Sequence, residues 1–189
     1  MRTWAQVMLC AAWMLPAVAS ANQTEHKTTD TTETASGKRT TDLASASDRK
    51  FIEKAAAGGM AEVKLGQLAM DKGTAPQVKD FGKRMVDDHG KANDELKEIA
   101  SKKNFPMPTE LDTKDKATYD KLSKLSGSAF DKAYMDAMVK DHDADVKEFK
   151  KEASLASADP DLKAFAEKTV KVLEEHKSMA HQDKDALKK

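Results

Sequence analysis

Apolar residues recur every three to four positions along several long stretches of the chain. The clearest seam consists of Val78, Phe81, Met85, Ala92, Leu96 and Ile99. His89 fills the one gap in this seam. Such spacing places the apolar side chains on one face of an α-helix. The chain is therefore predicted to be helical, with the apolar faces of its helices packed against one another.

Four main helices are predicted, over residues 48–72, 74–103, 128–155 and 160 to near the C-terminus. The connection between the second and third is long, residues 104–127, and contains two prolines and a short helical stretch at about 113–125. A long connection can cross the full height of a bundle. The predicted fold is all-α, a ferritin-like four-helix bundle with a long crossover that contains a short helix between main helices 2 and 3.

Local signals mark where these helices begin and end. Gly73 is expected to end the first helix, because glycine favours the position after a helix. Thr74, followed by Pro76 and Gln77, is expected to cap the second helix. Asp159 before Pro160 is expected to cap the fourth.

The N-terminus has the pattern of a secretory signal. Arg2 precedes an apolar run, which is followed by Ala19-Ser20-Ala21, and small residues of this kind mark a cleavage site. Residues 1–21 are predicted to be a signal peptide cleaved after Ala21, with a retained membrane anchor as the alternative. Residues 22–46 are rich in Thr, Ser and charge and are predicted to be a disordered linker. The folded domain is then residues 47–189, exported to the periplasm or cell envelope.

The composition of the chain argues against several classes of function. Lys plus Arg and Asp plus Glu both number 32, so the formal net charge is zero, and no basic surplus favours nucleic acid. Cys10 is the only cysteine and lies in the predicted signal, which excludes disulfides and thiolate catalysis in a cleaved chain. No later stretch is apolar enough for a membrane span, so none is predicted after cleavage. The sequence indicates no particular protein partner.

Each main helix carries one ionisable residue at the centre of its apolar face. These residues are Glu62, His89, His142 and His176. Because a helix turns by about 100° per residue, each side chain points into the bundle, and each lies near the middle of its helix. The four are therefore predicted to converge in the interior.

Burying four ionisable groups costs free energy unless they are paired or bound. Two arrangements would meet this requirement. Three imidazoles and a carboxylate could hold a transition metal ion, with iron, copper, zinc and manganese all acceptable. Alternatively, the four could hydrogen-bond one another as a metal-free network. A different helix register, which would keep them apart, is the third possibility.

Further acidic residues flank this predicted cluster. Asp88, Asp141 and Glu175 directly precede the three histidines, so they point about 100° to the side. They are either partners that orient the imidazoles or exposed helix charges. Asp145 follows His142 by one turn and could join the site.

Three glycines surround Glu62, namely Gly58, Gly59 and Gly66. Each weakens a helix by roughly 1 kcal/mol. They are expected to allow either close helix approach or space near the site.

Several motifs together resemble a known family. They are the stretches 51–66, 85–89, 130–134, 138–142 and 165–176, which include Met85-Val-Asp-Asp-His89 and Met138-Val-Lys-Asp-His142. The combination is similar to the bacterial ferritin-like domain family of unknown function that is often labelled "predicted outer membrane protein". The resemblance covers about residues 47–187 and implies an exported helical bundle with no agreed activity. A periplasmic or surface-associated protein fits the helical pattern better than that label.

Two functions follow from these observations. The first is a metal-binding bundle based on the Glu/His cluster. The second is a non-enzymatic envelope or stress protein with a metal-free polar core. Hydrolysis has little support, because no Ser/His/Asp motif or phosphate-binding glycine loop stands in the right context, and no catalytic residue is predicted.

Overall fold

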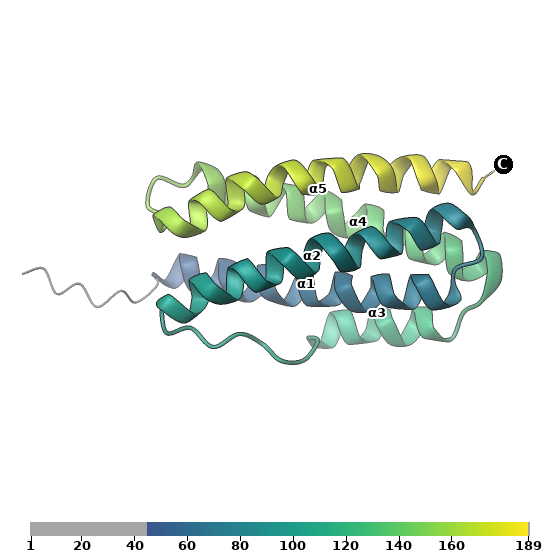
Figure 1. The fold of residues 1–189 in the computed structure, drawn as a ribbon, viewed down its shortest axis with the longest axis horizontal. Coiled ribbons are helices and arrows are strands. Elements are labelled where there is room, and N and C mark those ends of the chain that lie inside the picture. The colour runs from purple at the N-terminus through teal and green to yellow at the C-terminus, as the bar shows by residue number, and fades with distance from the viewer. Residues whose placement is uncertain (1–44, 189) are drawn as a thin grey trace, which may run out of the picture. The chain divides into compact units, whose positions relative to one another are not determined.

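The computed structural model describes residues 45–188, and regular structure within this range is entirely helical (Figure 1). The helices are α1 (Ala46–Lys72), α2 (Pro76–Lys102), α3 (Thr113–Ser123), α4 (Gly127–Ser154) and α5 (Pro160–Ala186). The prediction of an all-α bundle is confirmed, and the short helix in the long connection is present as α3. The predicted signal peptide, 1–21, and residues 22–44 of the predicted linker lie outside the described residues.

The bundle consists of two helical hairpins and a crossover. α1 packs along α2, α4 packs along α5, and the hairpins meet through α2 with α5 and α1 with α4. After α2, the chain returns along the bundle through a loop and α3, which lies against α1 and touches α4 (Figure 1). α4 therefore begins at the end of the bundle that holds the α1–α2 turn.

A buried carboxylate ties that end together. Asp131, near the start of α4, is 2% exposed. It accepts hydrogen bonds from the backbone N–H groups of Thr74 (3.0 Å) and Ala75 (2.9 Å), and from the Thr74 hydroxyl. The expectation that Thr74 caps α2 is wrong. Ala75 occupies that position without a side-chain cap, and the carboxylate comes from across the bundle.

Gly73 ends α1, as predicted. Its φ of −58° is not left-handed, so this position does not use the conformation that glycine alone adopts easily. Its N–H still closes α1 on the Ala69 carbonyl at 2.9 Å. What the position requires is a small residue, because a Cβ would lie 2.5 Å from that same carbonyl oxygen.

At the opposite end of the bundle, acidic helix caps join α1 to α5. Ser45 and Asp48 form a capping box at the start of α1, so residues 45 and 46 belong to the folded domain rather than to the predicted linker. Asp159 caps α5, as predicted, by accepting from two backbone N–H groups. Its own N–H donates to Asp48 at 3.3 Å, and the Lys103 ammonium lies 2.6 Å from its carboxylate.

The apolar core is divided into two clusters. One is built around Phe51, Phe149 and Phe165, whose rings lie 5.0–6.5 Å apart. The other is built around Phe81, Phe130 and Tyr134. Every long helix contributes to both clusters and carries one buried ionisable residue between its two contributions. A polar layer thus crosses the bundle at mid-height.

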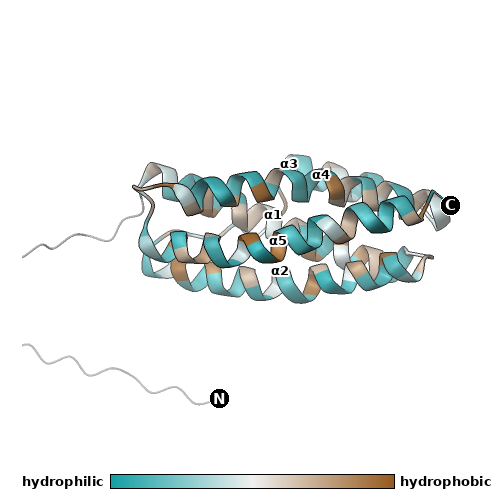
Figure 2. Ribbon diagram, turned by 90° about the horizontal axis from the view of Figure 1, so that it is seen from above, coloured by the Kyte–Doolittle hydropathy of each residue, from teal (hydrophilic) through white to brown (hydrophobic). Residues whose placement is uncertain are grey.

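The outer surface of the bundle is strongly polar. Brown apolar positions alternate with teal polar ones along each helix (Figure 2), as expected for helices that bury one face. Among residues 45–188, no helix combines the length and apolar character needed to cross a membrane.

α1 and α2 approach closely where two glycines face each other. A Cβ on Gly66 would lie 2.6 Å from the Gly82 carbonyl oxygen, and a Cβ on Gly82 would lie 2.7 Å from that of Gly66. Both distances are too short for a side chain, so each backbone fills the space that a methyl group would need.

Replacing either glycine should force the hairpin apart. We expect Gly66→Ala or Gly82→Ala to lower the free energy of unfolding by about 1–3 kcal/mol, as overpacking does. Gly90→Ala is the matched control, since a Cβ there meets nothing within 4 Å, and it should stabilise the chain by up to about 1 kcal/mol. Urea denaturation measures all three. Equal stabilisation by all three would contradict the close approach.

Candidate metal centre

The polar layer brings Glu62, His89, His142 and His176 together in the bundle interior. Their exposed fractions are 3%, 6%, 0% and 0%. The three imidazole centroids lie 5.2–5.7 Å apart, and one ring nitrogen from each lies within 4.8 Å of the other two. Each residue comes from a different long helix, so the site exists only when both hairpins are docked.

Glu62 joins two of the imidazoles. Its Oε2 lies 2.8 Å from Nδ1 of His89, and its Oε1 lies 3.4 Å from Nε2 of His142. The first distance is that of a hydrogen bond. The second contact is not hydrogen-bonded, and both of its atoms are buried without a hydrogen-bond partner.

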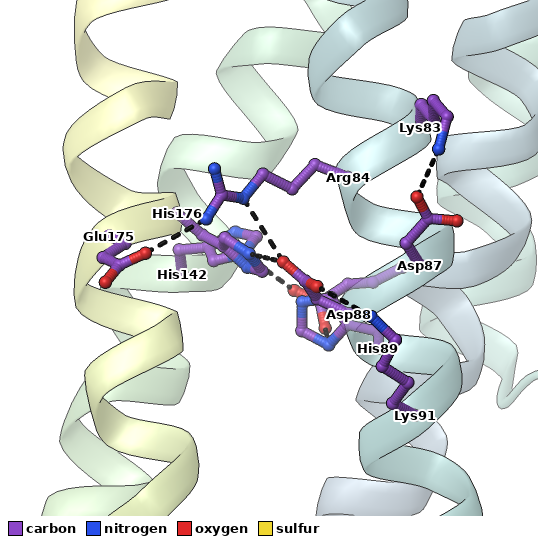
Figure 3. Close-up of polar contacts among 10 residues, drawn as sticks. Lys83, Arg84, Asp87, Asp88, His89, Lys91, His142, Glu175 and His176 are labelled. Atoms are coloured by element: carbon purple, nitrogen blue, oxygen red, sulfur yellow. Dashed lines mark hydrogen bonds and ion pairs between the residues drawn. The ribbon is translucent and has the colours of Figure 1, made fainter.

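The remaining ring nitrogens show how the histidines are oriented. His142 Nδ1 lies 2.9 Å from the Met138 carbonyl oxygen, to which it must donate. His176 Nε2 lies 3.0 Å from Asp88 Oδ2, and Figure 3 shows these residues meeting between α2 and α5. Since a neutral imidazole has one N–H and one lone pair, His142 and His176 each use their N–H in these contacts, and the His89 nitrogen that faces an oxygen is Nδ1.

One nitrogen on each ring is then left with a free lone pair. These atoms are Nε2 of His89, Nε2 of His142 and Nδ1 of His176, all buried and without a hydrogen-bond partner. Together with Glu62 Oε1 they make four unsatisfied acceptor atoms in one layer. Buried polar atoms normally have partners, so these four atoms are the ones that a bound cation could satisfy.

Burial keeps the histidines neutral. It lowers the pKa of His89 and of His176 to about 4, and it also lowers the pKa of His142. Burial raises the pKa of Glu62 to about 7 despite the opposing influence of His142. Neutral imidazoles are the form that binds metal ions, whereas an uncompensated carboxylate is disfavoured in this layer.

Asp88 is the acidic neighbour that contacts a histidine directly. Burial acts to raise its pKa, but the hydrogen bond from His176 and the charge of Arg84 outweigh burial and hold the pKa below its ordinary value. Arg84 Nε lies 3.3 Å from Asp88, and its Nη2 lies 3.0 Å from Glu175 (Figure 3). Of the two alternatives for Glu175, the exposed helix charge is the one observed, because its side chain is 65% exposed and pairs with Arg84.

Arg84 is part of this site but is not among the site residues predicted from the sequence. It precedes Asp88 by one helical turn, and that spacing is a signal for an ion pair on one helix face. Its contact with α5, however, depends on how the two hairpins dock.

Asp141 and Asp145 line a pocket with residues of α1 and α3, and Asp145 also lines a cavity that reaches Glu62 and His89. The Lys114 ammonium lies 3.7 Å from Asp141, and burial raises the pKa of this aspartate. Burial, reinforced by the Glu62 and Asp141 carboxylates, raises the pKa of Asp145 to about 8. Asp145 therefore lies beside Glu62, and Asp141 lies further out.

Comparison with known proteins places the chain in a family. Residues 17–182 match the family described as Domain of unknown function (DUF4142). The chain belongs to this family. The ferritin-like and outer-membrane descriptions expected from the resemblance are not part of that match. A search of curated proteins found no match.

One solved structure is similar in fold to this DUF4142 domain. It is the crystal structure of a DUF305 fragment from Deinococcus radiodurans, with a TM-score of 0.65 and 11% sequence identity. The similarity covers 74% of this chain and 96% of that one. At this identity the likeness concerns the helical fold alone.

The raised pKa of Asp145 makes stability depend on pH. The folded chain holds this proton up to about pH 8, whereas the unfolded chain loses it near pH 4. The contribution of protonated Asp145 to the free energy of unfolding is thus present in full below about pH 4 and is lost as the pH rises to about 8. Asn does not titrate. The free energy of unfolding of Asp145→Asn should therefore rise, relative to that of the native chain, by up to about 1.4 kcal/mol for each pH unit in this window.

Urea denaturation at about pH 5, 6.5 and 8, with a chelator present, measures this difference. Parallel profiles for the two proteins would show that Asp145 ionises freely in the folded state.

Proposed function

We propose that this protein binds a transition metal ion through His89, His142, His176 and Glu62. The observation that carries the proposal is the orientation of the three rings. His142 and His176 each donate an N–H to an oxygen, and His89 places Nδ1 2.8 Å from Glu62 Oε2. Each ring keeps its second nitrogen buried and without a partner, and one nitrogen of each ring lies within 4.8 Å of the others.

The surroundings of the rings support this proposal. Metal-bound histidines commonly donate their other N–H to a carboxylate or a backbone carbonyl, which fixes the tautomer and increases ligand basicity. Here Glu62, the Met138 carbonyl and Asp88 are placed as those acceptors. Three imidazoles and a carboxylate oxygen suit zinc, iron, manganese or copper.

A metal-free network accounts less well for the same atoms. The Glu62–His89 contact pairs two atoms, but Glu62 Oε1 and three ring nitrogens remain unsatisfied. Each unsatisfied buried group costs about 1–3 kcal/mol. A cation would satisfy these acceptors and would also stabilise the ionised form of Glu62.

The ferritin-like arrangement and the exported location are proposed from features outside the site. The parallel direction of α2 and α4, which follows from the crossover, supports a ferritin-like arrangement. The pattern of residues 1–21 supports export to the periplasm or cell envelope. No reaction is assigned to the site.

Isosteric variants give a sharp test of metal binding. Asn in place of His89 or His142 can keep the donor at the Nδ1 position while it removes Nε2. We expect the native chain to purify with near-stoichiometric metal, or to take it up, and the His89→Asn/His142→Asn chain to hold less than about a tenth as much. Elemental analysis of untagged protein measures this, and a metal at 100 times its Kd should add about 2.7 kcal/mol to the free energy of unfolding.

The control is His181→Asn, since His181 is about half exposed and pairs with Asp143 outside the layer. It should retain the native metal content. Circular dichroism checks that all chains fold. If the native chain holds no metal and gains none from zinc, iron, copper or manganese, the cluster is a polar network, and the non-enzymatic envelope role takes precedence.

The proposed export has its own test. Mass spectrometry of the protein from fractionated cells should find a mature chain that begins at Asn22 in the periplasmic or envelope fraction. An intact N-terminus in the cytoplasmic fraction would contradict cleavage after Ala21.

A further inference from the structure

A pocket of about 190 Å³ opens beside the polar layer, between α1, α3 and α4. Small residues form much of its wall, including Ala57, Gly58 and Ala61 of α1. A Cβ on Gly58 would meet nothing within 4 Å, so this glycine leaves open space rather than allowing close helix contact.

The polar lining of this pocket is mainly acidic. It includes Asp112 and Asp115 at the start of α3, and Asp141 and Asp145 one turn apart on α4. Burial raises the pKa of Asp115, and the nearby Asp112 and Asp141 carboxylates reinforce that shift. Several carboxylates therefore share a confined space, which attracts cations.

Two lysines also line the pocket, but each is engaged by acidic groups. The Lys54 ammonium lies 3.1 Å from Glu148. The Lys114 ammonium lies 3.8 Å from Asp115 and 3.7 Å from Asp141 and is mostly exposed. Lys114 thus rests at the mouth where a mobile cation could replace it.

Glu62 forms the inner end of the pocket. It is almost fully buried, and its Oε1 has no hydrogen-bond partner among the described residues. A second, smaller cavity of about 30 Å³ shares Lys54, Gly58, Glu62 and Asp145 with the pocket and reaches His89. About this volume is enough for one water-sized occupant. Glu62 therefore stands between the acidic pocket and the histidines.

On the opposite side of the layer, the acidic side chains are held in ion pairs. Arg84 spans Asp88 and Glu175 beside His176 (Figure 3). A guanidinium at that position repels cations and occupies both carboxylates. The two sides of the histidine layer thus differ: an ion-pair network covers the side of Arg84, whereas a pocket with an acidic lining opens on the side of α1, α3 and α4.

We propose that the acidic pocket between α1, α3 and α4 is the entrance through which a divalent cation reaches the histidine layer. This inference rests on the proposed metal-binding function. The carboxylates of α3 and the outer α4 attract the hydrated ion. Asp145 and Glu62, which line both the pocket and the cavity that reaches His89, would release their protons to water as the ion displaces them. A cleft lined by one sign of charge concentrates ions of the opposite sign and raises association rates.

Two kinds of variant test this entrance by different means. The Asp115→Asn/Asp141→Asn double variant removes charge at the mouth and leaves Glu62 and the histidines untouched. Gly58→Leu fills the passage with a side chain. Gly90→Leu is the matched control for the second, because a Cβ there also meets nothing within 4 Å and Gly90 lies on α2.

Stopped-flow absorbance of Co²⁺ uptake by the metal-free full chain measures both rate and final stoichiometry. At low ionic strength we expect the double Asp variant to take up Co²⁺ about tenfold or more slowly, with a weaker salt dependence. We expect Gly58→Leu to be slowed at every salt concentration and Gly90→Leu to match the native chain. All variants should reach the same final stoichiometry.

The outcomes separate the two proposals. Stoichiometric Co²⁺ binding at unchanged rates in the double Asp variant and in Gly58→Leu would overturn the entrance and leave the metal site standing. Failure of the native chain to bind Co²⁺ at all would overturn the metal site itself, and the entrance with it.

Discussion

Desolvation of four ionisable groups in one layer is the constraint on which the rest of this bundle depends. Removing three imidazoles and a carboxylate from water opposes folding unless their polar atoms find partners. Glu62, the Met138 carbonyl and Asp88 meet that need for one nitrogen on each ring. The apolar clusters on either side supply the burial that holds the layer together.

The ends of the bundle determine whether the layer forms. Asp131 ties the start of α4 to the α1–α2 turn, and the Asp48–Asp159 contact ties α1 to α5. A slip of one residue would rotate a helix by about 100° and would carry its ionisable residue out of the layer. Contacts far from the histidines therefore control how the histidines meet.

The layer is also asymmetric, and this asymmetry gives the proposed chemistry a direction. Arg84 and its two carboxylates cover the side where α2 meets α5. The side toward α1 and α4 opens instead into an acidic pocket beneath the crossover helix α3. The long connection that reverses the chain direction thus also supplies Asp112 and Asp115 to the mouth of that pocket.

The sequence alone determined the helices, their order and the inward position of Glu62, His89, His142 and His176. These features follow from helical periodicity and local caps, which depend on residues close together in the chain. The contacts of Arg84 with Glu175 and of Asp131 with Thr74 were decided only by the tertiary structure, as was the orientation of each imidazole. Each joins residues that are 57 or more positions apart or depends on rotation about side-chain bonds, and such distances and rotations are set when the two hairpins dock.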